Sequence, residues 1–524
     1  MYTDGNVYMG LDSKGKRVVL DLAYANRHGL IAGATGTGKT ITMKVMAESF
    51  SAAGVPVFLC DIKGDVCGIA EPGEDGKGMQ KRIDKFGIRN EFTYRSYPTI
   101  FWDIYGERGH QIRTTVKKMG PALMARILEL SEVQEGVLNI VFRVADKAEK
   151  ENNSDIEGRE LANLEDLRKM LNYAYLNREN LSIEYGNMAA TSITSIIRAL
   201  IPLEDQGADK FFGEPVFDIH EWFRKDDNGY GYVNLLDSVK LVQNPKLYST
   251  FLLWLMTELF AVLPEKGNVE KPELVFFFDE AHLLFKDAEK SLITKIEQTV
   301  KLIRSKGVGI YFVTQSPSDV PDTVLAQLSN RVQHALRAYT PAEQKAVKTA
   351  AQTFRPNPSF STESVIMTLG TGEALTSFLD DAGVPGIVQK TAIICPESLM
   401  SPCSDETRDY IMNNDPISLE IKRIEDEHRK AEEEEAAKRL NDENAALMEQ
   451  INQIRMEREK LKGGTSIAPA SSSAYAPVSG AGNDSEAERL RLETEKLRLE
   501  NEKAAMEIER MKLELEMAKL KAGK

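Results

Sequence analysis

The run GATGTGKT has the residue types of a phosphate-binding loop, at the spacing such a loop requires. Its residues are Gly33, Ala34, Thr35, Gly36, Thr37, Gly38, Lys39 and Thr40. Glycines permit a tight loop whose backbone N–H groups point at phosphate oxygens, and a following helix adds its dipole. In this pattern Lys39 reaches the terminal phosphates and the Thr40 hydroxyl binds Mg²⁺. The motif therefore predicts a site for a nucleoside triphosphate and Mg²⁺.

A pair of acids follows the apolar run LVFFF at residues 274–278. The first acid, Asp279, is placed to hold Mg²⁺ through its water shell, and the second, Glu280, to polarise the attacking water. A lone Asp would suit a kinase or a GTPase switch equally well, so the pair favours ATP hydrolysis. The alternative interpretation is an acidic strand end that caps a helix.

Three further polar groups are expected near the same site. The run GIYFVTQ ends a strand at Thr314 and places Gln315 where an amide can sense the γ-phosphate and align water. The run CDIKGD places Asp61 and Lys63 at another strand end, where ligands bind in open α/β sheets. Asp61 contributes to the nucleotide, Mg²⁺ or water network in one interpretation, and only to a turn in the other. His282 either relays the nucleotide state or is simply packed.

The elements that must position these groups are short apolar strands that alternate with helices. The candidate strands are residues 28–33, 55–61, 232–237, 274–279 and 309–314. Nearly continuous apolar strands separated by helices predict an α/β fold with a mainly parallel sheet covered on both faces. Residues 107–229 instead show helical periodicity, which predicts a largely helical insertion.

Composition excludes several classes of protein. The 524 residues carry a formal net charge of −14, and 42% of them are hydrophobic, so a chain disordered throughout is not expected. The acidic balance argues against a surface that coats nucleic acid or anionic membrane. The apolar run at 250–264 contains Glu258 and is too short to span a bilayer, which predicts a buried helix. With no signal peptide visible and four cysteines without metal-ligand spacing, we expect a cytoplasmic protein with no intrinsic membrane segment.

The chain changes character near residue 416. The body, residues 1–416, is followed by 108 residues that hold 20 Lys and Arg against 24 Asp and Glu. Heptad spacing predicts a charged helix or coiled coil at 417–462 and a second one at 484–524, joined by a flexible linker at 463–483. In each segment the apolar residues that recur every seven positions form a predicted seam for helix pairing. The first seam is Leu440, Leu447, Ile454 and Leu461, and the second is Leu492, Leu499, Met506, Leu513 and Leu520. A solvated single helix or a partly disordered tail is the alternative.

The motifs together resemble the HerA/FtsK superfamily of motor ATPases. The resemblance rests on GATGTGKT, CDIKGD, FFFDEAH, LIRSKGVGIYFVTQSPSDVP and LSNRVQHALRAYTPAEQKAV, in that order. Within the superfamily the chain is most similar to the HerA-like YjgR family of bacterial proteins, and LGTGEALTSFLD strengthens the match. The resemblance covers about residues 26–395 and implies a RecA-like P-loop core with an extra strand between the phosphate loop and the acidic strand.

The resemblance also implies a homo-hexameric ring with ATP between subunits and an arginine inserted from the neighbour. Arg304 and Arg331 lie in the matching motifs; Arg304 is preferred as the trans finger, and surface pairing is the alternative for each. HerA itself has an N-terminal β-barrel that docks a nuclease, but only 32 residues precede Gly33 here. We therefore expect no such barrel, and the C-terminal helices are a hypothetical replacement for assembly or docking.

Three functions remain open at this point. The leading one is an ATP-hydrolysing ring motor, a translocase or helicase-like enzyme that acts on DNA. The second is a nucleotide-switched oligomeric scaffold that binds a protein partner through its coiled-coil tail. The third is a motor recruited to a membrane by a partner. No concentrated Lys/Arg run marks a DNA surface in the body, so DNA rests on the resemblance alone.

Overall fold

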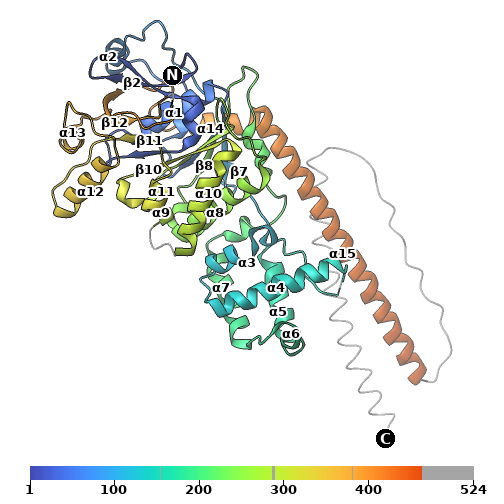
Figure 1. The fold of residues 1–524 in the computed structure, drawn as a ribbon. Helices are drawn as coiled ribbons and strands as arrows, with labels where there is room; N and C mark the ends of the chain where they lie inside the picture. Colours follow the sequence, from blue (N-terminus) through green and yellow to red (C-terminus); the bar gives the residue numbers. More distant parts are fainter. Residues whose placement is uncertain (154, 286–289, 381, 463–524) are drawn as a thin grey trace. The chain divides into compact units, whose positions relative to one another are not determined.

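A computed structural model describes residues 1–153, 155–285, 290–380 and 382–462. The chain divides into two compact units, Met1–Leu419 and Glu420–Lys524, and the second is described as far as Lys462. The first unit contains all the described strands and most of the helices (Figure 1).

The described strands form one sheet of 13 strands, of which eight run parallel in the order β11-β4-β10-β9-β5-β8-β6-β7. The parallel strands are β4 (Gly29–Ala32), β5 (Val57–Asp61), β6 (Thr99–Asp103), β7 (His110–Gln111), β8 (Val233–Asp237), β9 (Leu274–Phe278), β10 (Val308–Thr314) and β11 (Asn330–Gln333). The antiparallel extension comprises β1 (Tyr2–Thr3), β2 (Asn6–Asp12), β3 (Arg17–Asp21), β12 (Glu373–Ser377) and β13 (Gln389–Ile393). The predicted α/β class with a mainly parallel sheet is confirmed.

The strand β10 lies between β4 and β9, as the RecA-like resemblance implies. Tyr311 on β10 pairs with Gly29 on one side and with Phe277 on the other. Since the strands are parallel, the loops after β4, β9 and β10 all leave from the same edge of the sheet, and these loops carry the predicted chemical groups.

Helices cover both faces of the parallel sheet. On one face lie α1 (Lys39–Ala52) and α14 (Asp405–Asn414), whose apolar side chains share one buried cluster with alternate residues of β4, β5, β9 and β10. On the other face, α10 (Lys290–Ile303) packs on β10, and α8 (Pro245–Val262) places Tyr248 beside Cys60. The buried helix predicted at 250–264 therefore corresponds to α8 from residue 250 to its end at Val262. No helix in the described part of the chain is both long and apolar enough to cross a bilayer.

An aromatic cluster fills the second face of the sheet near β5, β6 and β9. Trp222 lies 4.3 Å from Phe58 and 5.8 Å from Phe276, and Trp102 lies 4.8 Å from Phe217 between ring centroids. Trp102 and Trp222 are both buried. Burying such a ring removes a large apolar area from water, which stabilises the fold by on the order of 2–3 kcal/mol for each ring.

The segment between β7 and β8 is mainly helical. It comprises α3 (Val116–Ile127), α4 (Glu132–Lys150), α5 (Leu164–Leu176), α6 (Arg178–Tyr185) and α7 (Ala190–Asp205), which gather apart from the sheet in Figure 1. A capping box between Ser131 and Gln134 starts α4, and apolar residues such as Leu138 and Val141 form its buried stripe.

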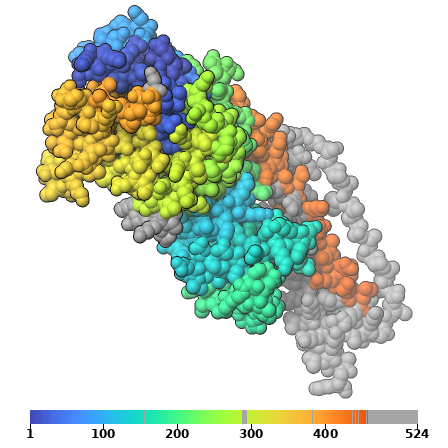
Figure 2. Space-filling view, viewed as in Figure 1, coloured from blue at the N-terminus to red at the C-terminus, as the bar shows by residue number. Residues whose placement is uncertain are grey.

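The N-terminal strands complete the sheet instead of forming a separate domain. Ala392 on β13 pairs with Leu11 on β2, and Figure 2 shows the blue N-terminal residues beside the orange residues of this extension. The remaining helices of the first unit are α2 (Lys77–Phe86), α9 (His282–Phe285), α11 (Asp322–Leu325), α12 (Pro341–Gln352) and α13 (Thr362–Thr368).

The second unit is described through one charged helix. The helix α15 (Pro416–Lys462) begins in the first unit, where Ile417 and Ser418 are buried, and continues as the helix of the second unit. It runs through the first predicted seam. The predicted linker at 463–483 and the second seam at 484–524 lie outside the described residues, so the coiled coil stays a prediction.

Candidate functional site

The phosphate loop connects β4 to α1 and depends on its glycines. Gly36 and Gly38 have φ angles of 76° and 116°, in the region that favours glycine. A Cβ on Gly33 would lie 2.5 Å from Cβ of His334, closer than two carbon atoms can approach. The loop ends at the first turn of α1, where unpaired N–H groups and the helix dipole favour an anion.

Lys39 is buried in this loop and is held by its own backbone. Its Nζ donates to the carbonyls of Gly33 at 2.7 Å and Ala34 at 3.3 Å. Burial lowers the pKa of Lys39, while the nearby Glu280 carboxylate opposes the shift. The Lys39 ammonium lies beside the backbone N–H groups of the loop, and together these positive groups suit the binding of a polyphosphate. The exposed Thr35 and Gly36 leave the turn accessible.

Two segments brace the phosphate loop from the antiparallel side of the sheet. His334, after β11, donates from Nδ1 to the Glu373 carbonyl at 3.0 Å and accepts at Nε2 from the Thr42 hydroxyl at 2.8 Å. Burial lowers the pKa of His334 to about 4, so the ring is neutral. The Gly372 N–H donates to the Thr37 carbonyl at 3.1 Å. Sequence reasoning did not single out His334 or Gly372, although both lie in motifs that carry the family resemblance.

The acidic pair follows β9 at the same edge. Asp279 is 5% exposed, and burial followed by the neighbouring Glu280 raises its pKa to about 6. Glu280 has a φ of 45°, unusual for a residue with a side chain, and is 7% exposed. Burial favours its protonated form, but the hydrogen bond and charge of Lys63 hold the pKa of Glu280 below its usual value.

The carboxylate of Glu280 is contacted by Lys63 and Gln315 from two other loops and by His282, two residues further along its own segment. Lys63 Nζ lies 2.8 Å from Oε1, and Gln315 Nε2 and His282 Nδ1 lie 3.4 Å and 3.3 Å from Oε2. His282 and Gln315 also line an open cleft of about 490 Å³ with Phe285, Ser316 and Asp319. The structure thus brings Glu280, Gln315 and Lys63 together beside a space that water can enter.

The residues fit a magnesium ion that is held mainly by nucleotide. Thr40, half-buried in the first turn of α1, and Asp279 supply the oxygen donors that Mg²⁺ prefers. Among the described residues no group of three or more His, Cys, Asp or Glu side chains is placed to hold a metal alone. Mg²⁺ sites are commonly built from one or two protein oxygens, phosphates and water. The raised pKa of Asp279 marks a buried carboxyl whose charge a cation would stabilise.

Asp61 shapes the loop after β5. Its carboxylate accepts from the N–H groups of Gly64 at 2.7 Å and of Val66 and Cys67 at 3.2 Å each. Burial, with Asp65 next in effect, raises the pKa of Asp61 to about 6. These contacts match the turn interpretation of CDIKGD, and they fix the loop from which Lys63 extends.

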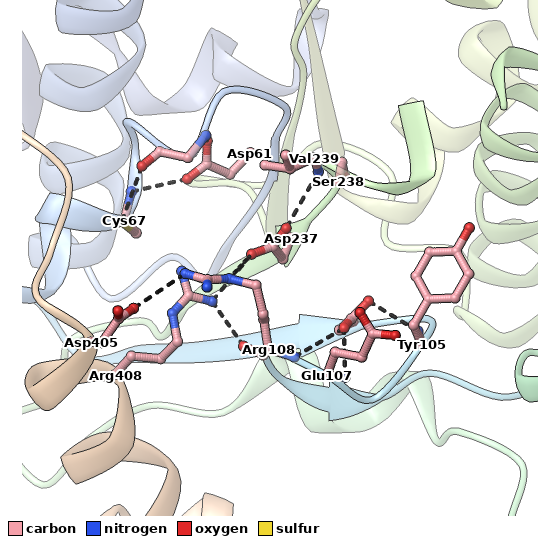
Figure 3. Close-up of polar contacts among 12 residues, drawn as sticks. Asp61, Cys67, Tyr105, Glu107, Arg108, Asp237, Ser238, Val239, Asp405 and Arg408 are labelled. Atoms are coloured by element: carbon pink, nitrogen blue, oxygen red, sulfur yellow. Dashed lines mark hydrogen bonds and ion pairs between the residues drawn. The ribbon is translucent and has the colours of Figure 1, made fainter. Parts of the chain in front are cut away.

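A second polar cluster continues along this edge (Figure 3). Arg108 donates from Nε to Asp237 at 2.9 Å and lies 3.4 Å from Asp405. Arg408 donates from Nη1 to the Arg108 carbonyl at 2.8 Å and lies 3.4 Å from the same Asp237. These bonds attach α14 to the ends of β6 and β8, which indicates a structural role.

The two candidate arginines have different surroundings. Arg331 donates to the carbonyls of Leu328, Thr353 and Leu325 at 2.9–3.1 Å, so each of its three side-chain nitrogens is bonded within its own chain. Arg304 begins the short turn before β10 and is half-buried. Because β10 runs parallel to β4, Arg304 lies at the sheet edge opposite the phosphate loop of its own chain. Burial, with Arg27 nearby, lowers the pKa of Arg304.

The fold and the site define a P-loop ATPase with a RecA-like core. The family model described as "Helicase HerA-like C-terminal" matches residues 7–507, so the chain belongs to this HerA-like family. A comparison with curated proteins finds no match.

Solved structures similar to this chain include those of a bacterial coupling protein and of VirB4. The bacterial conjugative coupling protein TrwB in unbound form shares 17% identity, over 76% of this chain and 93% of that chain, with a TM-score of 0.48. Plasmid coupling protein TrwB in complex with ADP and Mg²⁺ shares 16% identity over 77% and 99%, with a TM-score of 0.48. VirB4 of Thermoanaerobacter pseudethanolicus shares 15% identity over 78% and 99%, with a TM-score of 0.46.

Proposed function

We infer that this protein is an ATP-hydrolysing motor that assembles as a homo-hexameric ring and translocates DNA. The observation that carries the ATPase part is the meeting of the phosphate loop with the adjacent acids Asp279 and Glu280 at one sheet edge. Family membership supports the motor part.

Within the site each side chain has one task. The loop N–H groups and Lys39 bind the phosphates, and Thr40 and Asp279 hold the ion, which stabilises negative charge on the phosphates when it is bound. Glu280 accepts a proton from the attacking water, and Gln315 orients that water. Asp61 acts indirectly, by shaping the adjacent loop.

Arg304 completes the site in trans. It lies away from the phosphate loop of its own chain and has no ion-pair partner among the described residues, as a residue that serves a neighbouring subunit requires. Such an arginine stabilises charge on the transferring phosphoryl group and raises turnover by roughly 10³–10⁵.

The second candidate is a nucleotide-switched scaffold that holds a protein partner through its tail. The charged helix α15, which extends beyond the first unit, favours it. The net charge of −14 also leaves little positive surface for DNA outside a ring pore.

The discriminating experiment is the ATP hydrolysis rate with and without single- and double-stranded DNA, repeated at increasing salt. A DNA motor is stimulated, and the stimulation fades as salt releases phosphate contacts. Normal basal hydrolysis with no response to either DNA would overturn the DNA motor and favour the scaffold.

A further inference from the structure

The hydrolytic carboxylate is occupied in this structure by groups of its own chain. Lys63 engages Oε1 of Glu280 at 2.8 Å, and the nitrogens of His282 and Gln315 face Oε2. A carboxylate must present a free oxygen to a water molecule before it can accept a proton. Of the three contacts, the one to Lys63 is the shortest and the one that carries a permanent positive charge.

This ion pair differs from an ordinary surface salt bridge. The Glu280 side chain is 9% exposed, whereas the Lys63 side chain is 45% exposed. A buried carboxylate is stabilised strongly by its cation, because removing the cation leaves a charge that water cannot solvate. The Lys63 side chain is nevertheless flexible and partly exposed to solvent. Its ammonium can therefore move to another partner while the backbone of Lys63 stays in place.

The backbone below Lys63 is fixed by the neighbouring Asp61. Three N–H groups in the same loop, those of Gly64, Val66 and Cys67, donate to that carboxylate. The tether therefore keeps Lys63 within reach of the acidic pair. Lys39, which holds the phosphate loop, is close enough for the charges of Lys63 and Glu280 to act on its pKa.

A bound triphosphate brings new negative charge between these groups. Lys39 and Lys63 approach the acids Asp279 and Glu280 from different loops, and the γ-phosphate is the end of the nucleotide that points toward the hydrolytic carboxylate. A phosphate oxygen competes well for an ammonium, because charge-assisted hydrogen bonds to phosphate are strong.

We propose that Lys63 is a gate: it pairs with Glu280 while the γ-phosphate is absent and transfers to the γ-phosphate of bound ATP, which frees the Glu280 carboxylate for water. The proposal rests on the ATPase function inferred above. It assigns to Lys63 a role in distinguishing ATP from ADP, because ADP has no γ-phosphate to draw the ammonium away.

The test is equilibrium binding of Mg-ATP and Mg-ADP to the full-length Glu280→Gln chain, with and without Lys63→Met. This background slows hydrolysis, so ATP itself serves as the probe, and it removes the carboxylate that Lys63 neutralises. The expected result is that Lys63→Met weakens ATP binding roughly tenfold, the equivalent of one lost charge-assisted contact, and changes ADP binding less than about twofold.

The controls separate a phosphate contact from other effects. Lys63→Arg in the same background keeps most of the ATP affinity, and Lys14→Met, at an exposed turn, changes neither affinity. Equal ATP affinity with and without Lys63 would overturn the gate and leave Lys63 as a static partner of Glu280. Equal losses for ATP and ADP would also overturn it. If the Glu280→Gln parent binds neither nucleotide, the ATPase proposal fails instead.

Discussion

At the scale of single residues, the site depends on a few side chains that occupy unusual environments. Glu280 combines a left-handed backbone with near-complete burial, and Lys39 is buried against two loop carbonyls. Neither arrangement is favourable in isolation, and both suit a site that binds an anion and a cation.

Replacing Glu280 by Gln removes the proton acceptor and keeps the shape of the side chain. We expect ATP binding to persist and steady-state hydrolysis to fall by at least ~10²-fold, the range for loss of a general base. Filter binding and phosphate release measure the two quantities on the same preparation. Near-normal turnover would mean that another group activates the water.

Arg304 and Arg331 make different contacts, so we expect substitution of Arg304 to affect ATP hydrolysis and substitution of Arg331 to affect stability. We expect Arg304→Ala to fold normally and to lower hydrolysis by at least ~10²-fold. Mixing it with inactive Lys39→Ala subunits should restore part of the activity, because one chain supplies the intact phosphate loop and the other the arginine. No recovery on mixing would argue against a trans role.

Arg331→Met should instead lower stability. The substitution leaves three carbonyls without their donor, and we expect a loss on the order of 2–4 kcal/mol in the free energy of unfolding. Thermal and denaturant unfolding measure the effect. A stable Arg331→Met chain with low turnover would reverse the assignment of the two arginines.

Residue types and spacing predict the phosphate loop, the acidic pair and Gln315 as site residues, because each follows an apolar strand. The contacts of Lys63 with Glu280 and of His334 with Thr42 were not predictable in this way. They join residues 217 and 292 positions apart, and only the strand order brings them together.

At the scale of elements, apolar runs predicted the central strands and missed the outer ones. The predicted strand at 55–61 became β5, and those at 274–279 and 309–314 became β9 and β10, with ends shifted by one or two residues. The strands β2 and β13 mix polar and apolar residues because they lie toward the edge of the sheet, so their pattern is weaker. The strand β6 is fully buried and was missed because it lies just before the helical segment.

Two buried histidines join elements and make the stability of the fold depend on pH. His28 accepts at Nδ1 from the Ile310 N–H at 3.0 Å and so links the start of β4 to β10, while His334 links α1 to β12. Burial lowers the pKa of each to about 4. In the unfolded chain these imidazoles titrate near 6.5, so the unfolded state binds more protons between these two values.

The two histidines therefore lower the free energy of unfolding as pH falls from about 6.5 toward 4, by on the order of 3 kcal/mol each, whereas the raised pKa values of Asp61 and Asp279 act in the opposite direction. Denaturant midpoints measured across this range test the expectation. His28→Asn and His334→Asn should flatten the dependence even where they lower stability at neutral pH. A pH dependence identical to that of the wild type in both histidine variants would contradict the assignment.

At the scale of the whole molecule, most of the acidic excess lies in the ATPase body. The tail from residue 417 onward contributes −4 of the net −14, so the body contributes −10. A chain with this balance must confine any positive surface for DNA to a small region, such as the lining of a ring.

The boundary between the two units indicates at which residue the chain can be truncated without disturbing the first unit. Ile417 and Ser418 are buried in the first unit, so a truncation after Leu419 keeps its packing, whereas one after residue 416 would not. We expect the chain ending at Leu419 to fold and to bind ATP like the full chain, and its oligomer to dissociate at higher protein concentration. Light scattering over a dilution series tests this. An unchanged oligomer would exclude the tail from assembly.

The aromatic cluster beside β5, β6 and β9 determines what the intrinsic tryptophan fluorescence of this protein reports. The chain has three tryptophans, and Trp102, Trp222 and Trp254 are all buried in the first unit. None lies in the tail, so intrinsic fluorescence excited at the indole band reports on the ATPase body alone. Trp222 packs against Phe58 and Phe276, on the strands that lead to Asp61 and Asp279. A red shift of the emission therefore follows unfolding of the strands that hold the site, in the full chain and the truncated one alike.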